Sequence, residues 1–501
     1  MGVTDPLTKD GKAKDPFGLK PEEIEPVSLD ASQRFTGGKL NDFWAAILFA
    51  LHFLVTLGLG GFGAFCWVAY DDVGYYATPS TAEVYSIIGI TVAGVLVGAV
   101  FAVVYFVLGL KAPKLLIKLS MVGFVGIFLL YALLWLVLGV IYNSFWAYIT
   151  AGLLLIYVLL VAVILFVVYR KTIDLTAAYI TISIGILGRF KAILLVAILS
   201  IALYFVMILF WTVAFTLLTQ LFRVEYGPYI FVPAAFWMLF SWYWCAQVVK
   251  GVVRTTVAGV VGRWYFDEDS SPTATVLKSF SRASVTSIGS ICFGSLIVAI
   301  LSTSKSFFRF LYALNRGARP NNIIQCFIKC FVACLLMCCT IICLRLEIMM
   351  KYFNRYAFSF VAIYGMPYVK AGLSTAKMLA YNGLEAVLAD MNLYFVMFTQ
   401  MFAIGGVAAT VATCCIFVAQ AIAGETFDGF TWFMVEMLTI VAALGVGMLT
   451  TEIINYCLPA VLICSTDEPQ RMKDKVPELY ALMQGKYAGL RLMRECASHH
   501  C

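Results

Sequence analysis

One acidic residue, Glu452, lies in the middle of a long apolar stretch. Burying a charge in lipid costs about 3 kcal/mol or more on insertion scales, so a carboxylate at this depth needs a structural partner or a function. We expect Glu452 either to hydrogen-bond a neighbouring helix or to face a polar cavity. Glu436 and Glu347 lie nearer the ends of their apolar stretches, where an interfacial position or a structural role is expected.

Large aromatic residues lie deep in two further apolar stretches: Trp211, Trp242, Tyr243 and Trp244. A quaternary ammonium ion has no N–H group to donate, so aromatic faces hold it, each contributing roughly 0.5–2 kcal/mol, with an anion balancing the charge. These four rings and Glu452 are therefore predicted to form a substrate-binding site for an organic cation. The alternative is simple packing, because aromatic residues make up 15% of the chain.

No catalytic constellation is found in the sequence. The chain has three histidines, His52, His499 and His500, which leaves little for acid–base or metal chemistry. It contains no His-Glu-x-x-His, no Gly-x-Ser-x-Gly and no phosphate-binding loop. We therefore expect no catalytic residues, no metal and no cofactor, and the chain is not predicted to be an enzyme.

Composition defines the solvent of the chain. Of its 501 residues, 62% are hydrophobic and only 13% are charged, and the mean hydropathy is +0.92. There are too few polar residues to cover the surface of a soluble protein of this length. Most of the chain must therefore lie in lipid. This excludes a soluble enzyme, a disordered scaffold and a nucleic-acid binder. The net charge of +7 follows the ends of apolar runs and does not form a single basic face.

The apolar runs are long enough to cross the hydrocarbon core as helices, because lipid cannot satisfy free backbone groups. The predicted fold is an all-α, polytopic transmembrane helical bundle of about ten spans. A cytosolic disordered tail (1–43) and a cytosolic C-terminal tail (464–501) flank the membrane domain (44–463). The spans are expected at 44–70, 84–110, 119–140, 147–169, 191–222, 229–252, 285–304, 325–350, 392–421 and 433–463.

Lysine and arginine positions set the expected orientation. The N-terminal tail and alternate loops carry these cations, whereas segments 71–83, 141–146 and 422–431 carry none. Both termini are therefore predicted to be cytosolic. Segment 305–324 departs from the pattern, because it should be outside yet holds four basic residues. Either the two adjoining spans cross with a basic outer hairpin, or both dip in and return.

The stretch from Asn354 to Leu379 carries a family resemblance. Asn354-Arg355-Tyr356-Ala357, then Ala362-Ile363-Tyr364-Gly365 and Tyr368 closely resemble the signature of the choline transporter-like family, and segments 256–266 and 289–297 add to the match. The resemblance covers roughly residues 40–485. The short 71–83 loop and the Trp264-Tyr265-Phe266 ending are similar to the shorter fungal and protist members.

The resemblance implies a choline transporter-like fold and a solute carrier for choline. Its expected partners are choline, ethanolamine and related organic cations, together with the lipid bilayer. Transport would proceed by alternating access without ATP, and the plasma membrane is the expected location. The alternative is a non-transporting membrane protein with a structural or lipid-organising role.

The signature is expected in a cytosolic segment, 352–390. Gly365, followed two positions later by Pro367, predicts a helix break there. We expect the segment to act as an intracellular gate, with Asn354, Arg355, Tyr364 and Gly365 as its characteristic residues. Tyr364 either lines the inner mouth or packs under the break.

Overall fold

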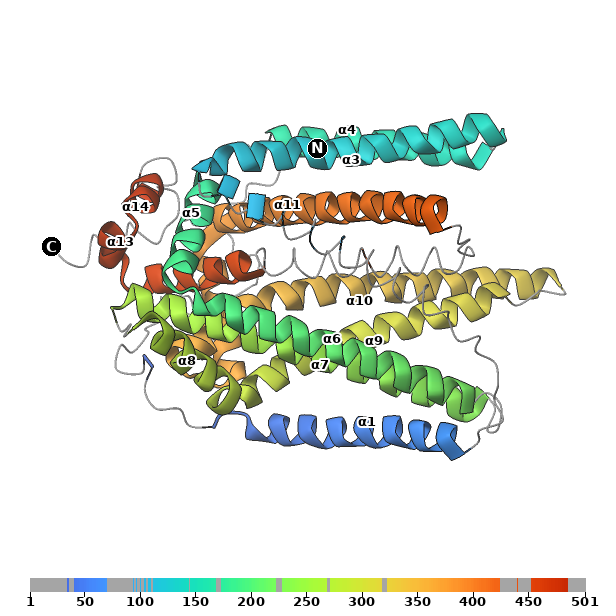
Figure 1. Cartoon of the computed structure of the whole chain (residues 1–501), viewed down its shortest axis with the longest axis horizontal. Coiled ribbons are helices and arrows are strands. Elements are labelled where there is room, and N and C mark those ends of the chain that lie inside the picture. Colours follow the sequence, from blue (N-terminus) through green and yellow to red (C-terminus); the bar gives the residue numbers. More distant parts are fainter. Residues whose placement is uncertain are drawn as a thin grey trace, which may run out of the picture. The chain divides into compact units, whose positions relative to one another are not determined.

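The computed structural model describes residues 34–35, 40–69, 111–143, 145–167, 173–221, 228–267, 271–317, 322–423 and 452–484, with scattered positions between 93 and 109 and at 439. These residues are helical apart from short turns and contain no strand. The all-α class predicted from the sequence is therefore confirmed (Figure 1).

Long helices make up most of the described chain. Four short elements join them or follow them: α8 (Pro272–Ser281), a π-helical turn (Arg282–Thr286), α13 (Pro469–Lys475) and α14 (Pro477–Gln484). The long helices are α1 (Phe43–Ala69), α3 (Pro113–Tyr142), α4 (Phe145–Val167), α5 (Ile173–Arg189), α6 (Ala192–Leu221), α7 (Pro228–Tyr265), α9 (Ile288–Gly317), α10 (Ile323–Tyr364) and α11 (Tyr368–Ala423).

The protein spans a membrane several times. Six helices among the described residues are long and apolar enough to cross a bilayer, or seven if α5 and the first part of α6 form one bent span. The spans expected at 84–110 and 433–463 lie mostly outside the described residues. The total of ten spans therefore stays a prediction.

The helices divide into two units. Unit 1 contains α1, α6, α7, α8, α9, α10, the start of α11 up to Leu379, and residues 459–467. Unit 2 contains α3, α4, α5, the rest of α11, residues 452–458, α13 and α14. These units do not test the predicted division into two tails and one membrane domain, which stays a prediction.

Unit 1 is built on close packing of α7, α9 and α10, of which α9 and α10 form an antiparallel pair (Figure 1). Glycines allow the close approach. A Cβ atom added at Gly251 of α7 would lie 2.6 Å from a side-chain carbon of Ile291 in α9. One added at Gly294 of α9 would lie 2.5 Å from the ring of Tyr368 and 2.7 Å from that of Phe358. Any larger side chain would push these helices apart.

Several helices extend past their predicted membrane spans. The 42-residue α10 is about 63 Å long at 1.5 Å per residue, twice the hydrocarbon thickness, and its last two turns are buried in protein. The α9 helix runs to Gly317 instead of ending at 304, so Lys305 and Arg309 belong to the helix and not to a loop. Only 318–322 separate α9 from α10.

The helix break predicted at the signature is confirmed. The α10 helix ends at Tyr364 and α11 begins at Tyr368. Gly365 has φ +63°, a left-handed conformation that suits glycine, and its N–H donates to the carbonyl of Val361 at 3.0 Å. Residues 352–390 are thus the end of α10, a three-residue break and the start of α11.

Unit 2 contains an antiparallel helical hairpin of α3 and α4, turned at Asn143 in a left-handed conformation with φ 47° (Figure 1). Polar contacts join α3 of this hairpin to α11 and α5. The Thr399 hydroxyl of α11 donates to the carbonyl of Ser120 in α3 at 3.0 Å, and Lys114 pairs with Asp174 of α5 at 2.9 Å.

Candidate functional site

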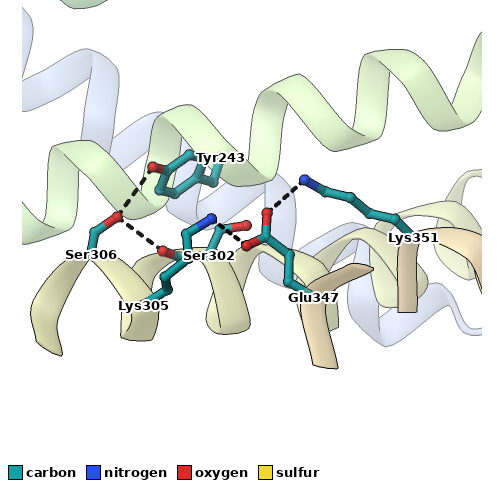
Figure 2. A network of polar contacts seen from close by, with 6 residues as sticks. All are labelled: Tyr243, Ser302, Lys305, Ser306, Glu347 and Lys351. Carbon is teal, nitrogen blue, oxygen red and sulfur yellow. Dashed lines mark hydrogen bonds and ion pairs between the residues drawn. The ribbon is translucent and has the colours of Figure 1, made fainter. Parts of the chain in front are cut away.

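A charged network lies inside unit 1, where α7, α9 and α10 meet (Figure 2). The Glu347 carboxylate on α10 is 4% exposed. It accepts a short hydrogen bond from the Lys305 ammonium on α9, and the Lys351 ammonium, one turn along α10, donates to its other oxygen at 2.6 Å. Two cations therefore share one carboxylate in a membrane-spanning hairpin.

Lys305 and Glu347 lie inside long helices and not at their ends. Lys305 lies 12 residues before the end of α9 at Gly317, which is about 18 Å of helix. Glu347 was expected near the end of its apolar stretch, in a structural role, and it pairs with Lys305 of α9 and with Lys351 one turn along α10. Ionisable groups are rare in apolar helices and usually pair with one another there, so this network is a candidate functional site.

Hydroxyl groups join this network to α7. The Tyr243 hydroxyl shares a hydrogen bond of 3.2 Å with the Ser306 hydroxyl, which also donates to the carbonyl of Ser302 at 3.0 Å (Figure 2). Ser302 and Ser306 lie one turn apart on the face of α9 that carries Lys305. A tyrosine predicted to bind substrate is thereby placed beside the charged residues.

An aromatic cluster on the facing side of α7 surrounds His52. Trp237, Phe240 and Trp244 recur at helical spacing on α7, and the centroids of their rings lie 5.1, 5.3 and 4.9 Å from the imidazole of His52 on α1. Phe49, one turn before His52, adds a ring 5.2 Å from that of Trp244. The cluster presents the kind of aromatic faces to which cations bind.

The imidazole of His52 has an unusual environment. It is 4% exposed, and neither Nδ1 nor Nε2 has a hydrogen-bond partner in the described structure. A buried polar atom without a partner costs about 1–3 kcal/mol. The nearby polar groups are already engaged, since Thr56 bonds to Ser241 at 2.9 Å and receives the indole N–H of Trp237 at 3.3 Å.

The predicted cage residues lie in three places in unit 1, and Tyr243 is the one beside the charged network. The rings of Trp211 and Trp242 are 6.2 Å apart, and Trp211 donates to the carbonyl of Met238 at 3.1 Å. Trp244 instead belongs to the cluster around His52 and donates to the carbonyl of Cys292 at 3.1 Å. Successive residues on a helix point about 100° apart, so Trp242, Tyr243 and Trp244 cannot share one face. Their role in binding stays a prediction.

Glu452 lies in unit 2. It accepts a hydrogen bond of 2.9 Å from the Tyr456 hydroxyl, one turn along the same helix. The residue is half-buried, and its predicted role as a counter-charge stays a prediction.

The signature residues form a buried group at the end of α10. The amide of Asn354 donates to the carbonyl of Gly294 at 2.8 Å, and its oxygen accepts a short hydrogen bond from the Tyr368 hydroxyl across the break. Burial raises the pKa of this phenol, so it remains protonated and donates. Arg355 is 1% exposed, with its guanidinium 5.0 Å from the ring of Tyr352. Tyr364 donates to Asp467 at 2.6 Å. These contacts pack Tyr364 under the break.

Sequence reasoning missed two parts of this site. His52 was considered only as one of three histidines, although Phe49, His52 and Phe53 recur at a spacing that puts them on one helix face. The pairing of Lys305 with Glu347 joins residues 42 apart in sequence. The available signal was an acid, Glu347, in one apolar stretch and a base, Lys305, directly after the preceding stretch.

Comparison with known proteins places the chain among membrane carriers. A family model described as plasma-membrane choline transporter matches residues 153–470. A CTL-like protein of Dictyostelium discoideum is 26% identical over 476 residues, covering 91% of this chain and 77% of the relative.

Fungal relatives match a smaller part. Protein PNS1 of Mycosarcoma maydis is 26% identical over 261 residues, covering 50% of this chain and 45% of the relative. Protein PNS1 of Kluyveromyces lactis is 33% identical over 158 residues, covering 30% of this chain and 27% of the relative. The matches thus span less than half the length of these two fungal proteins. The resemblance predicted from the signature is confirmed.

Proposed function

Because the chain belongs to the plasma-membrane choline transporter family, we propose that it carries choline, and also ethanolamine and related organic cations, across a membrane. Transport proceeds by alternating access without ATP, driven by the membrane potential or by proton exchange. The family match over residues 153–470 is the observation on which the proposal rests. The plasma membrane, with both termini cytosolic, is the proposed setting.

The chemistry of unit 1 supports an organic cation as the substrate. A quaternary ammonium needs aromatic faces and a carboxylate at some distance. The rings around His52 and the Trp211–Trp242 pair supply aromatic faces. Glu347 supplies a buried acid, which pairs with Lys305 and Lys351. Glu452 remains the second candidate for the counter-charge.

Uptake by purified protein tests this proposal. Proteoliposomes with an inside-negative potential should accumulate labelled choline, and hemicholinium should inhibit the uptake. Absence of uptake by folded protein, at any potential or pH gradient, would favour the structural or lipid-organising alternative.

Variants then locate the site. Trp244→Leu and Trp211→Leu should each weaken choline binding by roughly 2- to 30-fold, the range expected for losing one aromatic face. Trp44→Leu is the matched control, because Trp44 is 52% exposed on α1. Glu452→Gln and Glu347→Gln, compared for uptake per folded molecule, decide which acid balances the substrate charge. Full uptake in Glu452→Gln would remove Glu452 from the site.

A further inference from the structure

The chain just before α1 lies against the break between α10 and α11, although the two are more than 320 residues apart in sequence. Four described residues make the contact: Arg34, Phe35, Asn41 and Asp42. They all belong to unit 1, as does the break. The sequence predicted only a disordered tail here.

A buried ion pair fixes the beginning of this segment. Two nitrogens of the Arg34 guanidinium lie 2.7 and 2.9 Å from one carboxylate oxygen of Asp467, and the two side chains are only 8% and 7% exposed. The same oxygen accepts the hydroxyl of Tyr364, the last residue of α10. The guanidinium also stacks on Phe266 with 4.0 Å to the ring centroid.

Phe35 continues the contact. Its N–H donates to the carbonyl of Ile363 at 3.0 Å, and its ring lies 4.4 Å from the guanidinium of Arg263. The ring fills the space beside Gly262 of α7, where an added Cβ would lie 2.9 Å away. Phe35 is thus held by its backbone and by both sides of its ring.

Asn41 and Asp42 bind the other side of the break. The Asn41 amide donates to the carbonyl of Gly365 at 2.5 Å. One carboxylate oxygen of Asp42 accepts the N–H of Tyr368 at 2.7 Å and the hydroxyl of Ser290 at 2.6 Å.

These bonds satisfy groups that the break itself leaves open. The last carbonyls of a helix and the first N–H groups of the next have no partner within their helices. The carbonyls of Ile363 and Gly365 and the N–H of Tyr368 are such groups, and the N-terminal segment supplies a partner for each. Losing it would leave three backbone groups of the break without these bonds.

We propose that Arg34, Phe35, Asn41 and Asp42, together called the latch, hold the α10–α11 break closed and must let go for the carrier to open to the inside. The inference rests on the proposed transport function and adds positioning residues to it, namely Arg34, Phe35, Asn41 and Asp42. Hinge motion at 365–367 would change backbone angles there, and three latch bonds end on this hinge or within two residues of it, at Ile363, Gly365 and Tyr368.

A single substitution in α9 can displace the latch without touching its side chains. A Cβ at Gly289 would lie 2.5 Å from the backbone oxygen of Asp42 and closer still to that of Asn41, so Gly289→Ala must move the segment. Gly317→Ala is the matched control in the same helix, because a Cβ there meets nothing within 4 Å.

Hydrogen exchange measures the latch without any transport assay. In Gly289→Ala, the peptides containing the amides of Phe35 and Tyr368 should exchange at least tenfold faster than in the wild type, and Gly317→Ala should not differ. Asp42→Ala should expose the Tyr368 amide in the same way, and Asp42→Asn, which keeps an oxygen acceptor, should restore part of the protection. If Gly289→Ala does not fold, exchange at the Tyr368 amide in the two Asp42 variants tests the latch instead.

Uptake kinetics connect the latch to transport. A carrier with an open inner end spends less time able to bind external substrate, so the apparent KM for external choline rises as that fraction falls. We expect at least a threefold rise in Gly289→Ala and in Asp42→Ala, with Gly317→Ala equal to the wild type.

Three results separate the proposals. Unchanged exchange at Phe35 and Tyr368 in Gly289→Ala and Asp42→Ala overturns the latch. Faster exchange with unchanged uptake kinetics also overturns it, because the segment would then be packing alone. If the wild type carries no choline at all, the proposed function fails, and the exchange data alone decide whether the latch holds the break.

Discussion

At the scale of single residues, Glu347 and His52 show two ways of burying a polar group in a membrane protein. Glu347 is surrounded by partners, with the Lys305 and Lys351 ammonium groups on its two oxygens. His52 has aromatic rings on its faces and no hydrogen-bond partner in the described structure. Removing one partner of the Glu347 ion pairs should destabilise the protein. The unpaired nitrogens of His52 already lower its stability.

Removing the Glu347 charge should destabilise the protein strongly. Glu347→Gln leaves Lys305 and Lys351 without their counter-charge, and breaking a buried pair from one side typically costs about 3–5 kcal/mol. The thermal midpoint of purified protein in detergent should fall by several degrees. Glu468→Gln is the control, because its pair with Arg471 is 30% and 39% exposed, and such surface pairs contribute about 0–1 kcal/mol. Equal midpoints for the two variants would contradict this account of the network.

Replacing the buried imidazole should do the reverse. His52→Phe keeps a ring of similar size among Trp237, Phe240 and Trp244, and it removes two nitrogens that lack partners. A gain of about 1 kcal/mol in unfolding free energy is expected from the desolvation cost avoided. Thermal unfolding measures it, with His52→Ala as the cavity-forming comparison. A loss of stability in His52→Phe would mean that a water or ligand hydrogen-bonds to the imidazole nitrogens of His52.

At the scale of helices, the structure depends on small residues at crossing points. Gly251 and Gly294 let α7, α9 and the start of α11 approach one another, and the Asn354 amide bonds to the carbonyl of Gly294 at the same crossing. The charged network also involves α9, which it joins to α10 through Lys305 and Glu347. A shift of these helices would therefore disturb both the packing and the ion pairs.

A methyl group at Gly294 should test this packing. Gly294→Ala places a carbon within 2.5–2.9 Å of the rings of Tyr368 and Phe358, and overpacking of this kind costs about 1–3 kcal/mol. Gly61→Ala on α1, where nothing lies within 4 Å, should be close to neutral. The readout is thermal stability, and a neutral Gly294→Ala would show that α9 moves freely against α11.

Hydropathy predicted where helices cross the membrane better than where they end. The first span was expected at 44–70 and α1 is Phe43–Ala69. The expected spans 229–252 and 325–350 continue as α7 to Tyr265 and α10 to Tyr364. These extensions are buried in protein, and their polar residues lower the hydropathy although the helix continues. The break at Gly365 was predictable because glycine and proline act locally.

The site was less predictable than the fold. Deep aromatic residues were identified by composition, yet which of them meet depends on helix rotation, and Trp242 and Trp244 turn to different neighbours. The Lys305–Glu347 pair depends on the register of two antiparallel helices. Helix rotation and register are tertiary properties, and a hydropathy profile contains neither.

At the scale of the whole molecule, the described helices form two units, and α11 runs through both, changing from one to the other after Leu379. The break at its start is thus part of unit 1, and most of its length belongs to unit 2.

Ligand binding should stabilise the whole protein. A ligand that binds only the folded state at 100 times its Kd adds about 2.7 kcal/mol, so millimolar choline should raise the thermal midpoint. The uncharged isostere 3,3-dimethyl-1-butanol has the same shape and should have no effect, because aromatic faces attract the positive charge. Equal stabilisation by both compounds would show that shape alone is recognised. No stabilisation by choline would argue against choline as the substrate.

The pairing of Arg34 with Asp467 has a practical consequence for anyone shortening this chain. Trimming back to the first apolar residue, Phe43, looks harmless on a hydropathy plot, yet it would delete the guanidinium that neutralises Asp467 and the side chains that cap the ends of α10 and α11. Such a trimmed chain should unfold at a lower temperature than the full-length protein, because a buried carboxylate and the helix ends would lose their partners.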